Sequence, residues 1–214
     1  MTRSLDVLVL ENGPGSAREA IEALEEAGHR VHRCHEPGEP PFPCRAIIDP
    51  AACPLHGHID VALLVRHHVH PHPSPLEDGV SCAIRAGLPV VEEGPGILDP
   101  YEPYIALRID PASRHTVAEL CEEAVEMGHR PLAADILRRC SLLFDSAGID
   151  AGQVRCRMEP SGPRLLVHLD VPGQVRKGIR EALAVRALDA VRATGRTYGA
   201  VNVQVHEVPT LATV

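Results

Sequence analysis

The chain has 214 residues, a formal net charge of −8 and an apolar fraction of 44%, but only three tyrosines, two phenylalanines and no tryptophan. Aromatic residues are scarce and basic residues are dispersed, which argues against a nucleic-acid partner. Proteins that bind nucleic acids use aromatic side chains to stack on bases and a concentrated cationic surface to bind phosphates. No apolar run approaches the ~20 residues needed to span a bilayer, and no signal-peptide core follows the first residues. A cytoplasmic protein with no membrane partner is therefore expected, and its seven cysteines suit reduced thiols.

The first half of the chain alternates strand and helix signals. Residues 6–10 are nearly all apolar, as in a strand buried on both faces of a parallel sheet. A helix is expected over 16–28, with Ser16 as its N-cap and Glu19 completing a capping box. A strand over 29–34 then closes a βαβ unit.

The rest of this half continues the pattern after a proline-rich loop at 37–43. Residues 59–65 form the clearest buried strand, and they lead into a loop rich in histidine and proline. A helix over 77–86 and strands over 88–92 and 104–108 complete an open, mostly parallel α/β sheet with flanking helices.

The pattern changes from residue 111 onward. Helices are expected over 117–127 and 132–147, separated by Gly128 and Pro131. Two strands, a long helix and a last strand follow, in the order α-β-β-α-β. The sequence thus predicts two domains, an α/β domain over 1–110 and a smaller α+β domain over 111–214. The expected ranges of the last four elements are 154–158, 164–171, 175–193 and 200–208.

Two short segments of the first half resemble each other. Residues 9–15 and 90–96 both end an apolar strand on a carboxylate and turn through Gly-Pro-Gly. Both turns are expected on the same edge of the sheet.

The strand ends of the first half supply candidate metal ligands. Ligands of open α/β sheets bind beyond the carboxyl ends of the strands, where Glu11, His67, His68 and Glu92 are expected. Carboxylates and imidazoles suit a divalent metal ion, zinc above all, or acid–base chemistry. The alternative is that polar residues gather there only because strands end at the surface.

Two further features of this half are candidate ligand sites. Gly13, Gly15 and Ser16 precede a helix, where free N–H groups attract anions, although Arg18 stands where a dinucleotide-binding fingerprint needs glycine. A simple capped turn is the alternative. Histidines also concentrate between residues 56 and 72, which adds His70 as a metal ligand by composition. The alternative is a solvated loop.

The first half resembles response-regulator receiver domains and, more broadly, flavodoxin-like folds. The residues that carry the likeness are 7–12, 59–65 and 88–91. Val65 stands at the position of the phospho-accepting aspartate, and no lysine precedes Lys177. The resemblance therefore implies a degenerate receiver-like module that does not use aspartyl phosphorylation.

The second half resembles two families. Residues 166–173 and 203–209 are similar to strands of the cytosolic domain of cation diffusion facilitator transporters, which would make His168 and His206 metal ligands. The same element order, with a terminal Val-Asn-Val-x-Val strand, also resembles alkaline-shock-type domains, which are not enzymes. A structural role for both histidines is the alternative.

These observations predict a non-catalytic regulatory or interaction protein that binds a divalent metal. Its partner would be another protein or a second copy of the chain. The rival hypothesis is a metal-dependent or phosphate-ligand enzyme that acts at the carboxyl edge of the N-terminal sheet.

Overall fold

The structure is a computed structural model that describes residues 4–36, 38–94, 99–109, 115–161, 164–194 and 198–209. The chain divides into two compact units, Met1–Gly128 and His129–Val214. The boundary predicted between residues 110 and 111 lies outside the described residues.

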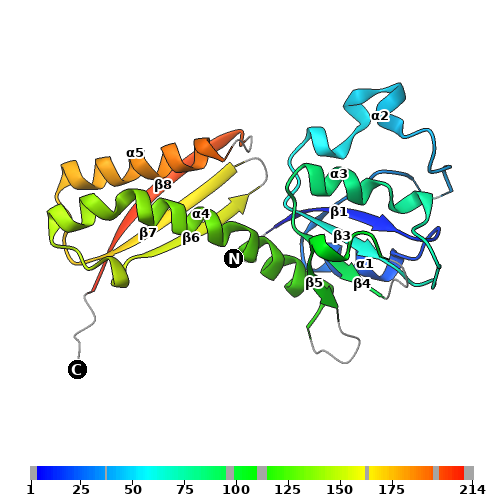
Figure 1. The fold of residues 1–214 in the computed structure, drawn as a ribbon, viewed down its shortest axis with the longest axis horizontal. Coiled ribbons are helices and arrows are strands. Elements are labelled where there is room, and N and C mark those ends of the chain that lie inside the picture. Colours follow the sequence, from blue (N-terminus) through cyan, green and yellow to red (C-terminus); the bar gives the residue numbers. More distant parts are fainter. Residues whose placement is uncertain are drawn as a thin grey trace. The chain divides into compact units, whose positions relative to one another are not determined.

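The first unit contains a five-stranded parallel sheet, which confirms the predicted open α/β fold (Figure 1). Its strand order is β2-β1-β3-β4-β5. Strands β1 and β3 lie inside the sheet and are buried almost throughout, as their apolar runs predict. The strands are β1 (Asp6–Glu11), β2 (Arg30–Arg33), β3 (Val61–Val65), β4 (Val90–Glu93) and β5 (Ile105–Ile109).

Helices cover both faces of this sheet. Helix α1 (Arg18–Glu26) packs on one face through residues such as Leu24, which contact Val7 and Val9 of β1 in one core cluster. Helix α3 (Gly79–Arg85) packs on the other face, where Leu8 and Leu10 belong to a second cluster. The remaining helical segments are α2 (Arg45–Ile48), η1 (Pro50–Ala52), η2 (Pro54–His56), η3 (Pro75–Glu77) and η4 (Glu102–Tyr104).

The start of α1 differs from the prediction. The prediction of a capping box formed by Ser16 and Glu19 is wrong, because the helix begins at Arg18. Its N-cap residue is Ala17, whose side chain accepts no hydrogen bond. The Glu11 carboxylate, at the end of β1, instead accepts the N–H of Ala17 at 3.1 Å. A contact between the strand end and the turn replaces the local cap.

Helix α4 (Val117–Ala147) is continuous, so the prediction of two helices is wrong. Pro131 lies inside it and removes one backbone N–H, which would bond to the carbonyl of the residue four positions earlier. The helix contributes to both units: Cys121 and Ala124 belong to the core of the first, and Ile136 and Phe144 to the core of the second. Packing on both sides of Pro131 outweighs the missing bond.

The second unit has the predicted α-β-β-α-β order, with a three-stranded sheet of order β6-β7-β8. Strand β6 is antiparallel to β7, and β8 is parallel to it. Figure 1 shows α4 and α5 on the same side of this sheet. Together they cover one face and leave the other open. The elements that follow α4 are η5 (Ala151–Gln153), β6 (Arg155–Ser161), β7 (Arg164–Pro172), α5 (Lys177–Ala193) and β8 (Ala200–Val208).

None of the helices in the described part of the chain combines the length and the apolar character needed to cross a membrane.

Candidate metal centre

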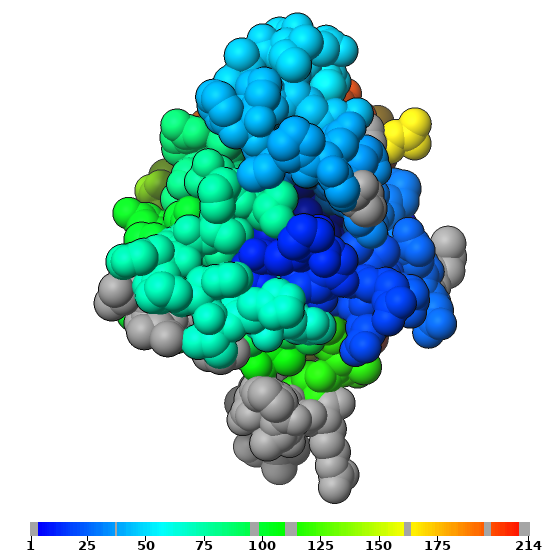
Figure 2. All heavy atoms as spheres, turned by 90° about the vertical axis from the view of Figure 1, so that its right-hand side faces the viewer, coloured from blue at the N-terminus to red at the C-terminus, as the bar shows by residue number. Residues whose placement is uncertain are grey.

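The carboxyl ends of β1, β3 and β4 meet at one edge of the sheet, as predicted. Figure 2 shows the turn after β1, in dark blue, beside the turquoise segment that follows β3. Asn12 donates its side-chain amide to the carbonyl of His68, and a Cβ on Gly13 would lie 2.7 Å from the His68 ring. On the other side of β3, Gly94 has a φ of +88°, and a Cβ there would lie 1.9 Å from the carbonyl oxygen of Arg66. Gly13 and Gly94, one from each of the two related segments, therefore both lie against the chain that leaves β3, while residues 95 and 96 of the second turn lie outside the described residues.

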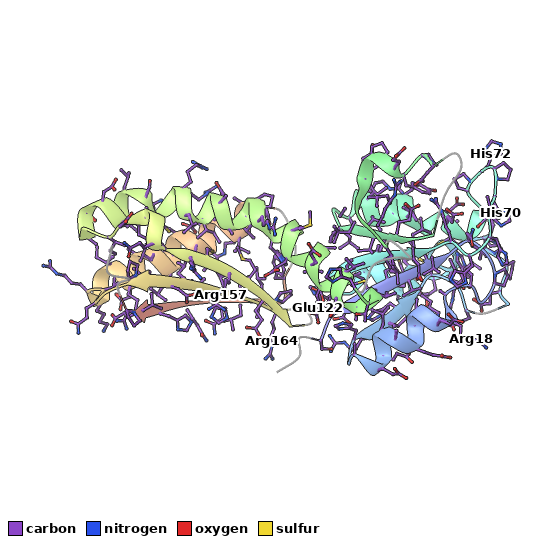
Figure 3. All side chains as sticks on the ribbon, turned by 90° about the horizontal axis from the view of Figure 1, so that it is seen from below. Arg18, His70, His72, Glu122, Arg157 and Arg164 are labelled. Atoms are coloured by element: carbon purple, nitrogen blue, oxygen red, sulfur yellow. The ribbon has the colours of Figure 1, made fainter. Side chains whose placement is uncertain are left out.

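The predicted ligands at this edge do not form a metal cluster. His67, His68 and His70 are exposed, and Figure 3 shows His70 and His72 at the outer end of their loop. Glu11 is engaged by the N–H of Ala17. Within the described ranges, no three carboxylates, imidazoles or thiols of this edge bring ligand atoms within 4.8 Å of one another.

Glu92 belongs to a buried ion-pair network instead. The Arg66 guanidinium lies 2.6 Å from Glu77 and 3.1 Å from Asp99, and it also contacts Glu92. Arg108 binds Glu92 from the other side at 2.6 Å. The side chains of Arg66, Glu77 and Glu92 are at most 4% exposed. Protein cations thus occupy the carboxylate that was predicted to bind metal.

Burial and ion pairing together set the pKa values of the charged groups in the network. Burial raises the pKa of Glu92, against the opposing effects of Arg108 and Arg66. For Asp99 burial acts in the same direction, but hydrogen bonds from Arg66 and from the N–H of Tyr101 outweigh it and lower the pKa. Arg66 has a raised pKa because its bonds to Asp99 and Glu77 outweigh its own burial. The cation at the centre of the network is therefore permanent.

Three backbone donors of the turn predicted to bind an anion are already engaged, whereas the buried Ser16 hydroxyl has no hydrogen-bond partner. The N–H groups of Ser16 and Arg18 donate to the carbonyls of Gly13 and Gly15, and that of Ala17 donates to Glu11. A ligand anion would have to displace the Glu11 carboxylate. Gly15 has a φ of +77°, which explains the glycine without a ligand.

The metal-ligand cluster that the structure does contain lies where β1 and β3 begin, at the amino ends of the strands. Asp6, His58 and Asp60 each offer one ligand atom, and these atoms lie within 4.8 Å of one another. Asp6 is the first residue of β1, and Asp60 immediately precedes β3, its parallel neighbour. The two aspartate side chains are 6% and 2% exposed, and that of His58 is 14% exposed. This buried group could hold a metal ion.

Hydrogen bonds hold the cluster in place. One Asp60 oxygen accepts the N–H of Asp6 at 2.9 Å, and the other lies 2.9 Å from Nε2 of His58. Asp6 is paired with Arg30 and lies 2.7 Å from Nε2 of His32, both on β2. Burial favours a raised pKa for Asp6, but the bonds from Arg30 and His32 outweigh it and lower the pKa. The Asp6 carboxylate is therefore ionised and available as a ligand at neutral pH.

The donors already present leave room for a metal ion. A carboxylate offers about four lone-pair positions. Asp6 uses three, two for Arg30 and one for His32, while Asp60 uses two, for the Asp6 N–H and for His58. Each aspartate thus keeps an acceptor position, and Nε2 of His58 would exchange its contact with Asp60 for the metal.

The sequence places His58 in the histidine-rich segment 56–72 but does not reveal Asp6 and Asp60 as its partners, because the expected ligands lay at the carboxyl ends of the strands. A signal was present: His58-x-Asp60 precedes the clearest buried strand, and Asp6 begins another. An acidic residue at the start of one apolar strand and another just before a second mark the amino edge when those strands are parallel neighbours.

The structure brings together the two histidines predicted as ligands in the second unit. Nδ1 of His168 lies 2.9 Å from Nε2 of His206, and the rings stack at 5.2 Å. Nε2 of His168 lies 3.2 Å from Glu159. In the described part of this unit, these residues are not joined by a third into a ligand group of the kind found around Asp6. A metal role for them stays a prediction.

No family model and no curated protein matches the sequence. A crystal structure of Era in complex with MgGDPNP and nucleotides 1506–1542 of 16S ribosomal RNA is similar at 12% identity, covering 98% of this chain and 94% of that chain. The TM-score of 0.33 is too low for this likeness to support an argument about fold or function.

Proposed function

We propose that the protein is a non-catalytic regulatory or interaction protein of the cytoplasm whose N-terminal unit binds a divalent metal ion through Asp6, His58 and Asp60. The observation that carries the proposal is the convergence of these three ligand atoms within 4.8 Å in a buried position. Carboxylates and imidazole are both ligand types that bind zinc in proteins. Zinc is therefore the first candidate.

Burial of the ligands favours a closed site over a catalytic one. Three protein ligands would leave a tetrahedral zinc ion one further position, the number found in catalytic sites, whereas structural sites enclose the metal with four. Here the two aspartate side chains are almost fully covered, and His32 and Arg30 occupy the other side of Asp6. Such a site would alter the stability of the unit when the metal binds, which suits a regulatory role.

The metal would act on the sheet through its ligands. Asp6 and Asp60 lie at the starts of adjacent strands, and Asp6 also bonds to β2. A ligand that binds only the folded state at 100 times its dissociation constant stabilises that state by about 2.7 kcal/mol. We therefore expect zinc to raise the unfolding temperature of the chain.

The test is equilibrium dialysis of the metal-free full chain against zinc, with metal analysis and thermal unfolding as separate readouts. Wild-type protein should bind one zinc per chain at this site and unfold at a higher temperature. His58→Ala and Asp60→Asn should each weaken binding by at least about 100-fold, because each removes a ligand from a small set. His32→Ala should cost about 10- to 100-fold, the usual effect of removing a residue that orients a ligand.

His70→Ala is the matched control, because it removes a histidine that is exposed on the histidine- and proline-rich loop after β3. It should leave the zinc affinity and the thermal shift unchanged. If His58→Ala and Asp60→Asn bind zinc like wild type while His70→Ala does not, the metal belongs to the loop and the proposal fails.

A further inference from the structure

The nine-residue strand β8 is an unprotected sheet edge. It pairs with β7 on one side, and in the described part of the unit no strand pairs with its other side. Proteins usually shield such edges with short strands, lysine, proline or charged side chains. Residues Ala200–Val208 contain no lysine, proline or glycine, and their one acidic residue, Glu207, is paired with Arg180.

The other sheet edges are protected. Strand β2 has four residues with an arginine at each end, and β5 has five residues that include Arg108. Strand β6 carries Pro160 and two arginines, of which Arg157 is shown in Figure 3 on the sheet of the second unit. Only β8 combines length with a lack of charge among these edge strands.

The backbone groups on the free side of β8 can be assigned. The carbonyl of Val208 accepts the N–H of Gly173, which continues β7, at 2.9 Å. Because backbone groups alternate in direction along a strand, those of Val201, Val203 and Val205 point away from β7. Each of these three valines thus offers one N–H and one carbonyl outward.

The same three valines leave apolar surface along the edge. Their register partners on β7 are Leu165, Val167 and Leu169, which are at most 1% exposed on the helix-covered face. The valines lie on that face too, but they are only half-buried. A further strand on this edge would cover them and satisfy their backbone groups.

We propose that β8 pairs with β8 of a second copy of the chain, antiparallel and across a two-fold axis at Val203. In this register Val201 faces Val205 of the partner subunit, and Val203 faces its own equivalent. On the open face, Asn202 lies opposite Gln204 of the partner subunit. A register centred on Val205 would instead place Glu207 opposite a valine.

The choice of a second copy as the partner follows from the residue pattern of β8 itself. The segment 201–205 reads valine, amide, valine, amide, valine, which is the same pattern in either direction. A two-fold axis pairs identical surfaces, so only a pattern of this kind matches apolar with apolar and amide with amide throughout. The pairing forms roughly six backbone hydrogen bonds, and the resulting six-stranded sheet has no long unprotected edge.

Sedimentation and light scattering of the full chain test the pairing. Wild type should approach twice the 23.1 kDa chain mass as its concentration rises. Val203→Pro removes an outward N–H and leaves the bonds to β7 intact, so it should weaken association by about 30-fold or more. Leu142→Ser, at a position 79% exposed on α4, is the control and should associate like wild type.

Cross-linking tests the register even if Val203→Pro does not fold. Position 202 of one chain and position 204 of the partner subunit form a pair without hydrogen bonds. The Cα atoms of such a pair lie about 4.5 Å apart, which is within disulfide range. Asn202→Cys combined with Gln204→Cys, or a mixture of the two single variants, should form cross-linked dimers under mild oxidation. Each single variant alone should not exceed the background of the native cysteines. Monomeric wild type across its soluble concentration range, or dissociation by Leu142→Ser and not by Val203→Pro, would overturn the proposal.

Discussion

Arg66 shows how one residue can fill the place where ligands of open α/β sheets usually bind. It directly follows β3, is 4% exposed and contacts Glu77, Glu92 and Asp99. Buried charge is costly unless it is paired, so these carboxylates depend on the guanidinium. The carboxyl edge of the sheet beside β3 and β4 is therefore stabilised by the protein's own cation.

Substitution of Arg66 by methionine should destabilise the first unit strongly. The change leaves buried carboxylates without their central cation, and breaking such a network costs about 3–5 kcal/mol. Urea unfolding at pH 7 measures the loss. Arg108→Met is the control, because the Arg108 side chain is 50% exposed and its loss should cost about 1 kcal/mol. Equal effects of the two variants would contradict the assignment of Arg66 as the central cation.

The pH dependence of this difference has a definite sign. Glu92 has a raised pKa in the folded protein, so its contribution to stability is complete below its ordinary value of 4.5 and is lost as pH rises through the folded value. Removing Arg66 raises the carboxyl pKa values further, because the attraction that favours the ionised form is gone. The deficit of Arg66→Met relative to wild type should therefore shrink when unfolding is measured at pH 5.

At the scale of single residues, the sequence predicts which residue types lie at the strand ends better than it predicts which side chains meet there. The residue types at the carboxyl ends of the strands were identified, but Glu92 is held by two arginines that lie 26 and 16 positions away along the chain. The Asp6 cluster likewise joins residues 54 positions apart. Strand order decides which of these side chains meet, and local patterns do not contain strand order.

At the scale of elements, the strands were predicted best. The apolar runs of β1 and β3 and the alternating pattern of β8 match the described strands closely, because each has the length and composition of its strand. Helix α4 was split in the prediction because Gly128 and Pro131 resemble a break. Contacts on both sides of that point keep the helix continuous, and such contacts lie outside any sequence window.

Pro131→Ala should stabilise the protein. Pro131 is exposed inside α4, so alanine loses no buried contact and restores one helical hydrogen bond. The gain should be about 1–3 kcal/mol, since proline is about 3 kcal/mol less favourable than alanine in a helix interior. Calorimetry should show a higher unfolding temperature. Pro75→Ala, at the first position of η3 where proline is favourable, should give no such gain. A lower unfolding temperature for Pro131→Ala would contradict the expectation.

At the scale of the whole molecule, α4 belongs to two cores. Its first half supplies part of the core beside α1, and its second half supplies part of the core beneath β7. The sequence predicted both α/β and α-β-β-α-β arrangements but assigned the whole helix to the second domain. The residues that place its first half in the other core are Ala118, Leu120, Cys121, Ala124 and Val125.

Truncation tests this division. A fragment of residues 1–128 should unfold cooperatively, whereas a fragment of residues 1–110 loses the α4 side chains from its core. That loss exceeds about 5 kcal/mol, which is comparable to the total stability of a small domain. Circular dichroism during heating and binding of a hydrophobic dye distinguish the two fragments. If residues 1–110 alone unfold cooperatively and bind no dye, α4 is dispensable to the first unit.

The continuity of α4 also sets an order of events during synthesis. Domains fold from the N-terminus as the chain emerges, and starting a helix is costly whereas extending one is not. When the first core captures residues 118–125, it supplies the helical nucleus. The segment that emerges next can then extend an existing helix. The first helix of the second unit can therefore form before any of that unit's strands has been synthesised.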